Sequence, residues 1–215
     1  MSVFRLDASI QGQRSASSEL ADAAEAEWSA VRPETVFVRR HLGTEPLPGD
    51  AWPAAVHAGF APEDQRTPAQ QDAVALARTL ADELRHAEAA ILALPLYNWG
   101  VSQHVKTWID LTIAGGDNGE RLLDGKQAIV LTTRGGGYGP GTPREGWDHN
   151  TAYLRRIVGD VWGAELTLIE RELTLAGVNP AMDPFLETAE LMKKAAHEAA
   201  WRAGRDAAAA AMPWR

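Results

Sequence analysis

The sequence contains no cysteine among its 215 residues. Disulfide bonds, thiolate metal sites and catalysis by a thiol are therefore excluded, and cysteine usage says nothing about the redox compartment. The six histidines show no HExxH or comparable spacing, so we expect no metal site.

Positive charge and long apolar runs are also scarce. The chain has 21 Lys and Arg against 29 Asp and Glu, a formal net charge of -8 at pH 7. This balance argues against nucleic acid and anionic membranes as partners, but a phosphate-bearing cofactor stays possible because backbone amides can hold phosphate. No apolar run approaches the roughly 20 residues of a membrane span, and the start MSVFRLDAS has no signal-peptide pattern. We expect a cytoplasmic protein.

Strand-like and helix-like segments alternate along the chain, which has the size of one well-buried domain, residues 1–215. Between the second strand and the next helix, residues 43–66 contain four prolines and predict an irregular lid or subunit contact. The Thr67-Pro68-Ala69-Gln70 run predicts the start of a helix that ends near His86. Five strands alternating with five helices predict a parallel, doubly wound α/β sheet. The expected strands are 3–9, 35–42, the apolar run that ends before Pro95, 127–133 and 165–175; the expected helices are 15–31, 67–86, 101–113, 147–161 and a last one from Leu186.

The most informative stretch is AILALPLYNWG, residues 90–100. Its apolar run predicts a strand buried on both faces, which Pro95 ends. In an open α/β sheet, ligands bind beyond the carboxyl ends of the strands. Leu96, Tyr97, Asn98 and Trp99 occupy that place, and two rings with an amide suit a flat ligand, although aromatic residues there can also serve core packing.

A hydroxyl-rich loop, residues 9–18, follows the first strand. Ser9, Ser15, Ala16 and Ser17 surround the start of a helix, where free amides and the helix dipole favour a phosphate. Simple helix capping by serine is an equally good interpretation. The loop matches neither GxxxxGK[ST] nor GxGxxG, so it favours a mononucleotide over a dinucleotide.

A glycine-rich loop follows the fourth strand. Thr133, Arg134, Gly135 and Gly136 begin it, and glycines allow a backbone to approach a ligand closely. A flexible surface turn is the alternative interpretation.

Together these segments resemble the three FMN-binding segments of the FMN-dependent NADH-azoreductase and quinone reductase family. The resemblance implies a flavodoxin-like fold with strand order 2-1-3-4-5 and FMN at the switch point. The GGGYGPGTPREGW segment after Arg134 differs from the azoreductases, which bears on the second substrate. The cofactor-binding residues that the resemblance implies are Ser9, Ser15, Ala16 and Ser17 for the phosphate, Pro95, Leu96, Tyr97, Asn98 and Trp99 along the ring, and Thr133, Arg134, Gly135 and Gly136 flanking it.

The same resemblance implies hydride transfer from NADH or NADPH through FMN to a small-molecule acceptor, a quinone or an azo compound, with no side-chain nucleophile. Tyr138 and His149 are candidate proton donors, although packing of Tyr138 and solvation of His149 are the simpler explanation. The family also implies a homodimer, and Trp52, Trp147 and Trp214 suit an interface.

Two alternatives remain open. A flavodoxin-type electron carrier would pass single electrons to a protein partner, but the long connection and extra length favour a substrate pocket. A specialised biosynthetic flavoenzyme on the same fold is the second, because fold does not fix function.

Overall fold

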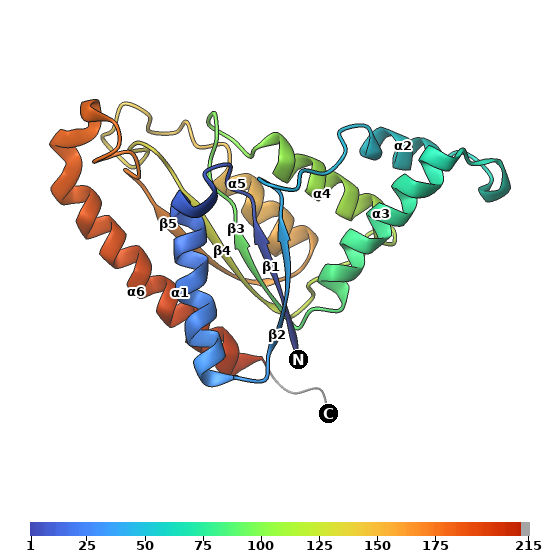
Figure 1. The fold of residues 1–215 in the computed structure, drawn as a ribbon, viewed down its shortest axis with the longest axis horizontal. Coiled ribbons are helices and arrows are strands. Elements are labelled where there is room, and N and C mark those ends of the chain that lie inside the picture. The colour runs from blue at the N-terminus through green and yellow to red at the C-terminus, as the bar shows by residue number, and fades with distance from the viewer. Residues whose placement is uncertain (212–215) are drawn as a thin grey trace.

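The computed structural model describes residues 1–211, apart from the side chain of Gln13. Five parallel strands form a single sheet in the order β2-β1-β3-β4-β5 (Figure 1). This arrangement confirms the predicted doubly wound α/β fold. The strands are β1 (Ser2–Asp7), β2 (Val36–His41), β3 (Ala89–Ala93), β4 (Gln127–Thr133) and β5 (Glu165–Arg171).

Helices cover both faces of the sheet. Two helices, α1 (Ala16–Val31) and α6 (Leu186–Ala210), pack side by side on one face. The other face carries α2 (Ala51–Ala58), α3 (Pro68–Arg85), α4 (Gln103–Gly115) and α5 (Thr151–Leu154), which continues as a π-helical segment, Arg155–Val161. Short 3₁₀ turns occupy Gly12–Arg14, Glu63–Gln65 and Pro180–Phe185.

The core has two halves, one under each helical layer. All of β3 is buried, as its apolar run predicts. On the α3–α4 side, Trp108 lies between Phe4 and Trp162, with ring centroids 6.2 and 5.3 Å away. On the α1–α6 side the two helices are in close contact, because a side chain at Gly204 would overlap the carbonyl of Ala24.

The predicted helix start at Thr67 is confirmed. The Thr67 hydroxyl accepts the N–H of Gln70, whose side chain accepts the N–H of Thr67, and Pro68 is the first helical residue. This reciprocal arrangement satisfies two backbone donors that the helix itself cannot. Val101 precedes α4 instead of joining it, because Ser102 caps that helix by accepting the N–H of Val105.

The prediction that residues 43–66 lack regular structure is wrong, because they contain α2 and a 3₁₀ turn. Alanine, the strongest helix former, fills half of α2. Pro53 is tolerated because it lies in the first turn, where a backbone N–H has no partner within the helix.

Two predicted boundaries also need correction. The helix expected from Trp147 begins at Thr151, because the Asp148 carboxylate accepts the N–H groups of Asn150 and Thr151 at 2.8 and 2.9 Å and fixes a turn before it. The fifth strand ends at Arg171 rather than Leu175. Leu173 has a φ of 58°, which is incompatible with an extended strand.

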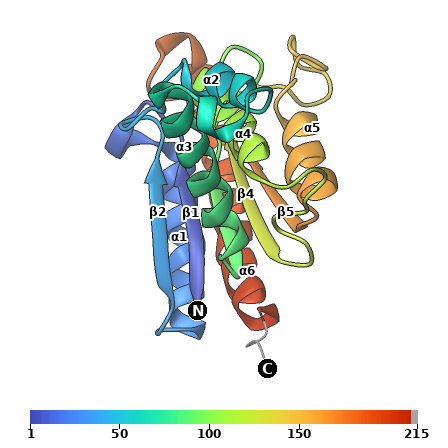
Figure 2. The same cartoon turned by 90° about the vertical axis from the view of Figure 1, so that its right-hand side faces the viewer.

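The loops that follow the strands gather at one edge of the sheet, at the top of Figure 2. This edge is where the three predicted ligand loops meet. Within residues 1–211, no helix has both the length and the apolar character needed to cross a bilayer.

Candidate ligand-binding site

A cavity of about 530 Å³ opens at the carboxyl edge of the sheet, between the loops that follow β1, β3, β4 and β5. Three of the predicted site residues do not line it, namely Ser15, Ser17 and Arg134. The predicted residues that do are Ser9, Ala16, Pro95, Leu96, Tyr97, Asn98, Trp99, Thr133, Gly135 and Gly136.

The first loop brings the start of α1 to this cavity. Ser15 caps the helix, since its hydroxyl accepts the N–H of Ser18 at 3.1 Å. Ser15 and Ser17 are buried with their hydroxyl oxygens 3.2 Å apart, and Ala16 between them faces the cavity. Ser15 accepts the N–H groups of Ser18 and Glu19, so the N–H groups at the very start of the helix, beginning with that of Ala16, are the ones available to an anion.

The hydroxyl of Tyr97 joins the first two loops. It lies 3.3 Å from the Ser9 hydroxyl oxygen and accepts the N–H of Ile10 at 3.2 Å. The Ser9 hydroxyl oxygen also accepts the N–H of Gln11 at 3.2 Å. One side chain from the loop after β3 therefore holds the loop after β1 in place.

The second loop is a tight turn in which two non-glycine residues adopt strained backbone angles. Tyr97 and Gly100 exchange two backbone hydrogen bonds of 3.0 Å, while Asn98 and Trp99 both have positive φ, 46° and 66°. This is the pattern of a type I′ turn. A bulky residue in the left-handed region is rare, and such strain is concentrated at functional sites. The turn presents the half-exposed Trp99 ring at the cavity.

Trp99 is linked to the segment after β4. Its ring meets the Trp147 ring edge to face, with centroids 6.2 Å apart. Its carbonyl accepts the N–H of His149 at 2.9 Å. The His149 side chain is exposed and lies outside the cavity, whereas the candidate proton donor Tyr138 lines it.

The glycines of the third loop allow neighbouring side chains to lie against its backbone. A side chain at Gly135 would come within 2.7 Å of Leu175, and one at Gly136 would collide with the guanidinium of Arg144. Both Leu175 and Arg144 line the cavity. These glycines therefore allow two cavity-lining side chains to approach the backbone, and the close approach of a ligand stays a prediction.

The Arg134 guanidinium is buried and turns away from the cavity. It forms ion pairs with Asp148 and Glu170, and its Nη1 lies 3.1 Å from Oε1 of Glu172. Burial acts to raise the pKa of Asp148, but hydrogen bonds from Thr151 and the charge of Arg134 outweigh it and hold this pKa below its ordinary value. Arg134 therefore anchors the surrounding chain.

Glu172 extends this anchor to the cavity wall. Its carboxylate accepts the N–H of Tyr138 at 2.9 Å as well as pairing with Arg134. The Tyr138 ring in turn lies near two guanidinium carbons, 5.9 Å from that of Arg134 and 5.8 Å from that of Arg144. The position of Tyr138 thus depends on a buried ion-pair cluster.

Several lining residues are absent from the sequence prediction. Val178 and its neighbours follow β5. The predicted strand order puts β5 beside β4, and because the strands are parallel, the carboxyl end of β5 must lie at the same edge of the sheet as the three predicted loops. The strand order could therefore have indicated these residues. The side-chain direction of Arg144 had no comparable signal. The lining residues missed are Gln11, Arg14, Arg144, Thr174, Leu175 and Val178.

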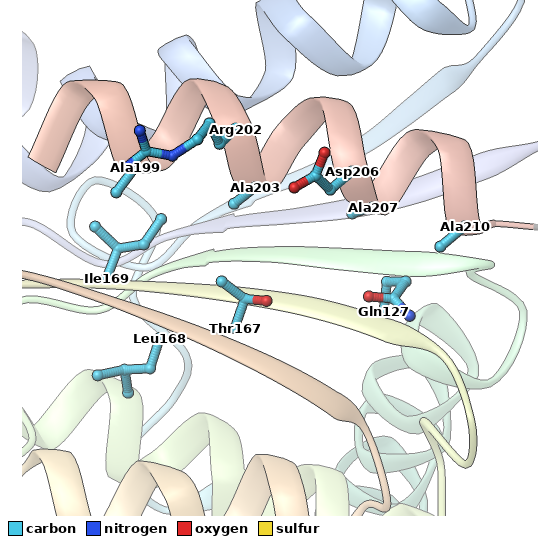
Figure 3. A pocket seen from close by; sticks show the side chains of 10 residues that line it. All are labelled: Gln127, Thr167, Leu168, Ile169, Ala199, Arg202, Ala203, Asp206, Ala207 and Ala210. Atoms are coloured by element: carbon cyan, nitrogen blue, oxygen red, sulfur yellow. The ribbon is translucent and has the colours of Figure 1, made fainter.

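A second cavity, of about 420 Å³, lies between α6 and the β4–β5 side of the sheet. Figure 3 shows Thr167 and Ile169 pointing toward α6, with Leu168 on the opposite side of the sheet. Its charged lining residues are Arg202 and Asp206 of α6. None of the strand-end loops borders this cavity, so we place the candidate site at the first one.

The chain matches known proteins over most of its length. A family model described as the flavodoxin-like fold matches residues 1–171. The FMN-dependent NADH:quinone oxidoreductase of Parafrankia sp. (strain EAN1pec) is 34% identical over 213 residues, covering 97% of this chain and 99% of that protein. The FMN-dependent NAD(P)H:quinone oxidoreductase 1 of Pseudomonas aeruginosa is 34% identical over 183 residues, covering 79% and 86%.

A solved structure has the same fold. The azoreductase from Bacillus anthracis str. Sterne superposes with a TM-score of 0.77 at 21% identity, covering 96% of this chain and 99% of that one. The five-stranded architecture is therefore shared over almost the whole chain.

Proposed function

The chain belongs to the flavodoxin-like family that contains the FMN-dependent NADH:quinone oxidoreductases, and we propose on this basis that it reduces quinone or azo acceptors with NADH or NADPH, using FMN. When bound, FMN would supply the hydride-transfer chemistry between the nicotinamide and the acceptor. The observation that carries the proposal is the cavity in which the three predicted loops meet at the switch point of the sheet.

The phosphate end of FMN fits the first loop. Ser9 supplies a hydroxyl, Arg14 a positive charge, and the first turn of α1 its free N–H groups and dipole. Ser15 and Ser17 support this turn from beneath, since Ser15 caps the helix and their hydroxyls lie together.

The ring end of FMN fits the second and third loops. Tyr97 and Trp99 supply aromatic surface, and Asn98 and Thr133 supply uncharged polar groups. No carboxylate is among the described residues that line this cavity. Negative charge that develops on a reduced ring therefore meets no like charge there.

A visible absorption spectrum of the purified protein with added FMN tests the proposal directly. We expect flavin bands that bleach when NADH is added without oxygen. Bands that persist would favour the electron carrier, and no bound flavin would contradict the proposal.

Two variants sharpen this test. Ala16→Glu places a negative charge where the phosphate should bind, and we expect it to abolish FMN binding. Ala26→Glu adds the same charge to an exposed position of the same helix and should bind FMN as the wild type does. Equal loss in both variants would mean that α1 had been disturbed and not that a phosphate site had been blocked.

We further propose that the protein is a homodimer. Large apolar side chains are exposed, with 84% of Phe60, 44% of Trp52 and 51% of Trp147 accessible, and aromatic residues are enriched at interfaces. Trp52 lies in α2, and Trp214 falls outside the described residues. Light scattering at micromolar concentration tests this, and a clean monomer would contradict it. The cytoplasmic location stays a prediction that cell fractionation can check.

A further inference from the structure

Arg144 belongs to the segment after Arg134 that the family resemblance leaves unexplained. Its guanidinium lies against Gly136, lines the cavity, and has its central carbon 5.8 Å from the Tyr138 ring. A cation over an aromatic face is held there by the ring quadrupole. Tyr138 therefore orients Arg144 at the cavity without neutralising its charge.

The nearby carboxylates are engaged elsewhere. Glu145 accepts the N–H of Gly141 at 2.8 Å, and Glu172 binds the Tyr138 N–H and Arg134. Within residues 1–211, Arg144 forms no ion pair, although the chain carries more acidic than basic residues. A cavity lined by cations and by no anion attracts negatively charged ligand groups.

The cavity has two such cations, and the fold separates them. Arg14 follows β1 and Arg144 follows β4, with β3 between these strands. Arg14 and the start of α1 account for the phosphate of FMN in the proposed function. Arg144 lies across the loop after β3 from Arg14. Its charge is therefore available to the second ligand, the one that shares the cavity with FMN.

Building on the proposed function, we propose that Arg144 binds an anionic group of this second ligand and so determines specificity. The group has anionic oxygen atoms that a guanidinium can bind in pairs, as in the diphosphate of NADH or the sulfonate of an acceptor. Arg144 contributes binding alone, since no bond forms or breaks at it.

Steady-state kinetics of Arg144→Gln test the proposal with NADH and two acceptors, a neutral naphthoquinone and its sulfonate. Arg78→Gln is the matched control, because Arg78 is exposed on α3 and lies outside the cavity. We expect Arg144→Gln to raise KM about tenfold for the ligand that carries the anion, with kcat unchanged, as for the loss of a charged hydrogen bond. Added salt should raise the wild-type KM toward that of the variant.

The two sources of the anion give different results. A raised KM for NADH with both acceptors identifies the nucleotide diphosphate, and a raised KM for the sulfonated quinone alone identifies the acceptor. Either result supports the proposal. If neither KM differs between Arg144→Gln and Arg78→Gln, the proposal is overturned.

A binding measurement separates this proposal from the proposed function. Two probes that a hydride cannot reduce, inorganic pyrophosphate and naphthalene sulfonate, are titrated by calorimetry into wild type and both variants. Binding of either probe that is weakened about tenfold only in Arg144→Gln supports the role of Arg144 even if NADH fails to bleach the flavin. Equal binding of both probes by all three proteins overturns it even if the enzyme is active.

Discussion

At the scale of single residues, Trp99 holds a backbone conformation that costs free energy. We predict that Trp99→Gly is more stable than Trp99→Ala by about 1 kcal/mol, because both remove the ring but only glycine adopts a φ of 66° without penalty. Urea unfolding of the two variants without cofactor measures this difference. An alanine variant as stable as the glycine variant would mean that the turn carries no strain.

Arg134 is predicted to act through the carboxylates around it. Replacing it by methionine leaves Asp148, Glu170 and Glu172 close together without a compensating charge. We expect Arg134→Met to lower the free energy of unfolding by about 3 to 5 kcal/mol. Arg156→Met, which breaks an exposed pair, should cost less than about 1 kcal/mol. Similar losses in both variants would argue against the buried cluster.

This cluster also predicts a pH dependence. In the wild type the pKa of Asp148 lies below its ordinary value, so its stabilising contribution is present above the unfolded-state pKa and is lost as the pH falls through the folded-state pKa. In Arg134→Met the facing carboxylates favour protonation of the folded state. The stability difference between wild type and variant should therefore shrink as the pH falls from neutral toward about 4. Unfolding measured across that range checks the sign, and a constant difference would contradict it.

At the scale of elements, the contact between α1 and α6 depends on one missing side chain. Gly204→Ala places a methyl group against the Ala24 carbonyl, and we expect it to lower the free energy of unfolding by about 1 to 3 kcal/mol. Gly159→Ala meets only ordinary contacts in the π-helical segment and should be neutral or slightly stabilising. Thermal unfolding of both variants tests this, and stabilisation by Gly204→Ala would mean that the helices can separate at no cost.

Elements whose signals are local could be predicted from the sequence. The capping run at Thr67 and the apolar run of β3 depend on neighbouring residues alone, so their structural consequences were predictable. α2 is hard to predict because the prolines around and within it suggest an irregular loop, although Pro53 falls in the first turn of a helix, where proline is tolerated. The predicted fifth strand is too long because no neighbouring residue in the sequence indicates the positive φ of Leu173.

At the scale of the whole molecule, the meeting of the three loops at one cavity was predictable, whereas the side-chain contacts around that cavity were not. The rule that ligands bind at the carboxyl ends of parallel strands placed three loops together. The partners of Arg134, by contrast, lie 14, 36 and 38 residues away in sequence. Tertiary contacts decide which way that side chain turns, so Arg134, a residue expected to flank the cofactor, pairs with carboxylates outside the cavity.

One sheet with a helical layer on each face predicts cooperative unfolding. We expect the single domain proposed for residues 1–215 to unfold in urea in one transition. Tryptophan fluorescence reports both layers, because Trp28 of α1 is buried in the core half on the α1–α6 face and Trp108 of α4 is buried in the half on the other face. The fluorescence and far-ultraviolet circular dichroism curves should coincide, and separate midpoints would mean that the layers unfold independently.

The hydroxyl of Tyr97 couples the order of the loop after β3 to the order of the loop after β1. It belongs to the turn after β3, which is proposed to bind the ring, yet it contacts Ser9 and the N–H of Ile10 in the loop proposed to bind the phosphate. A ligand that orders one loop therefore lowers the entropic cost of ordering the other. Riboflavin lacks the phosphate, so we expect it to bind more weakly than FMN by more than the free energy of the phosphate contacts alone. The binding free energies of the ring and of the phosphate should therefore not be additive.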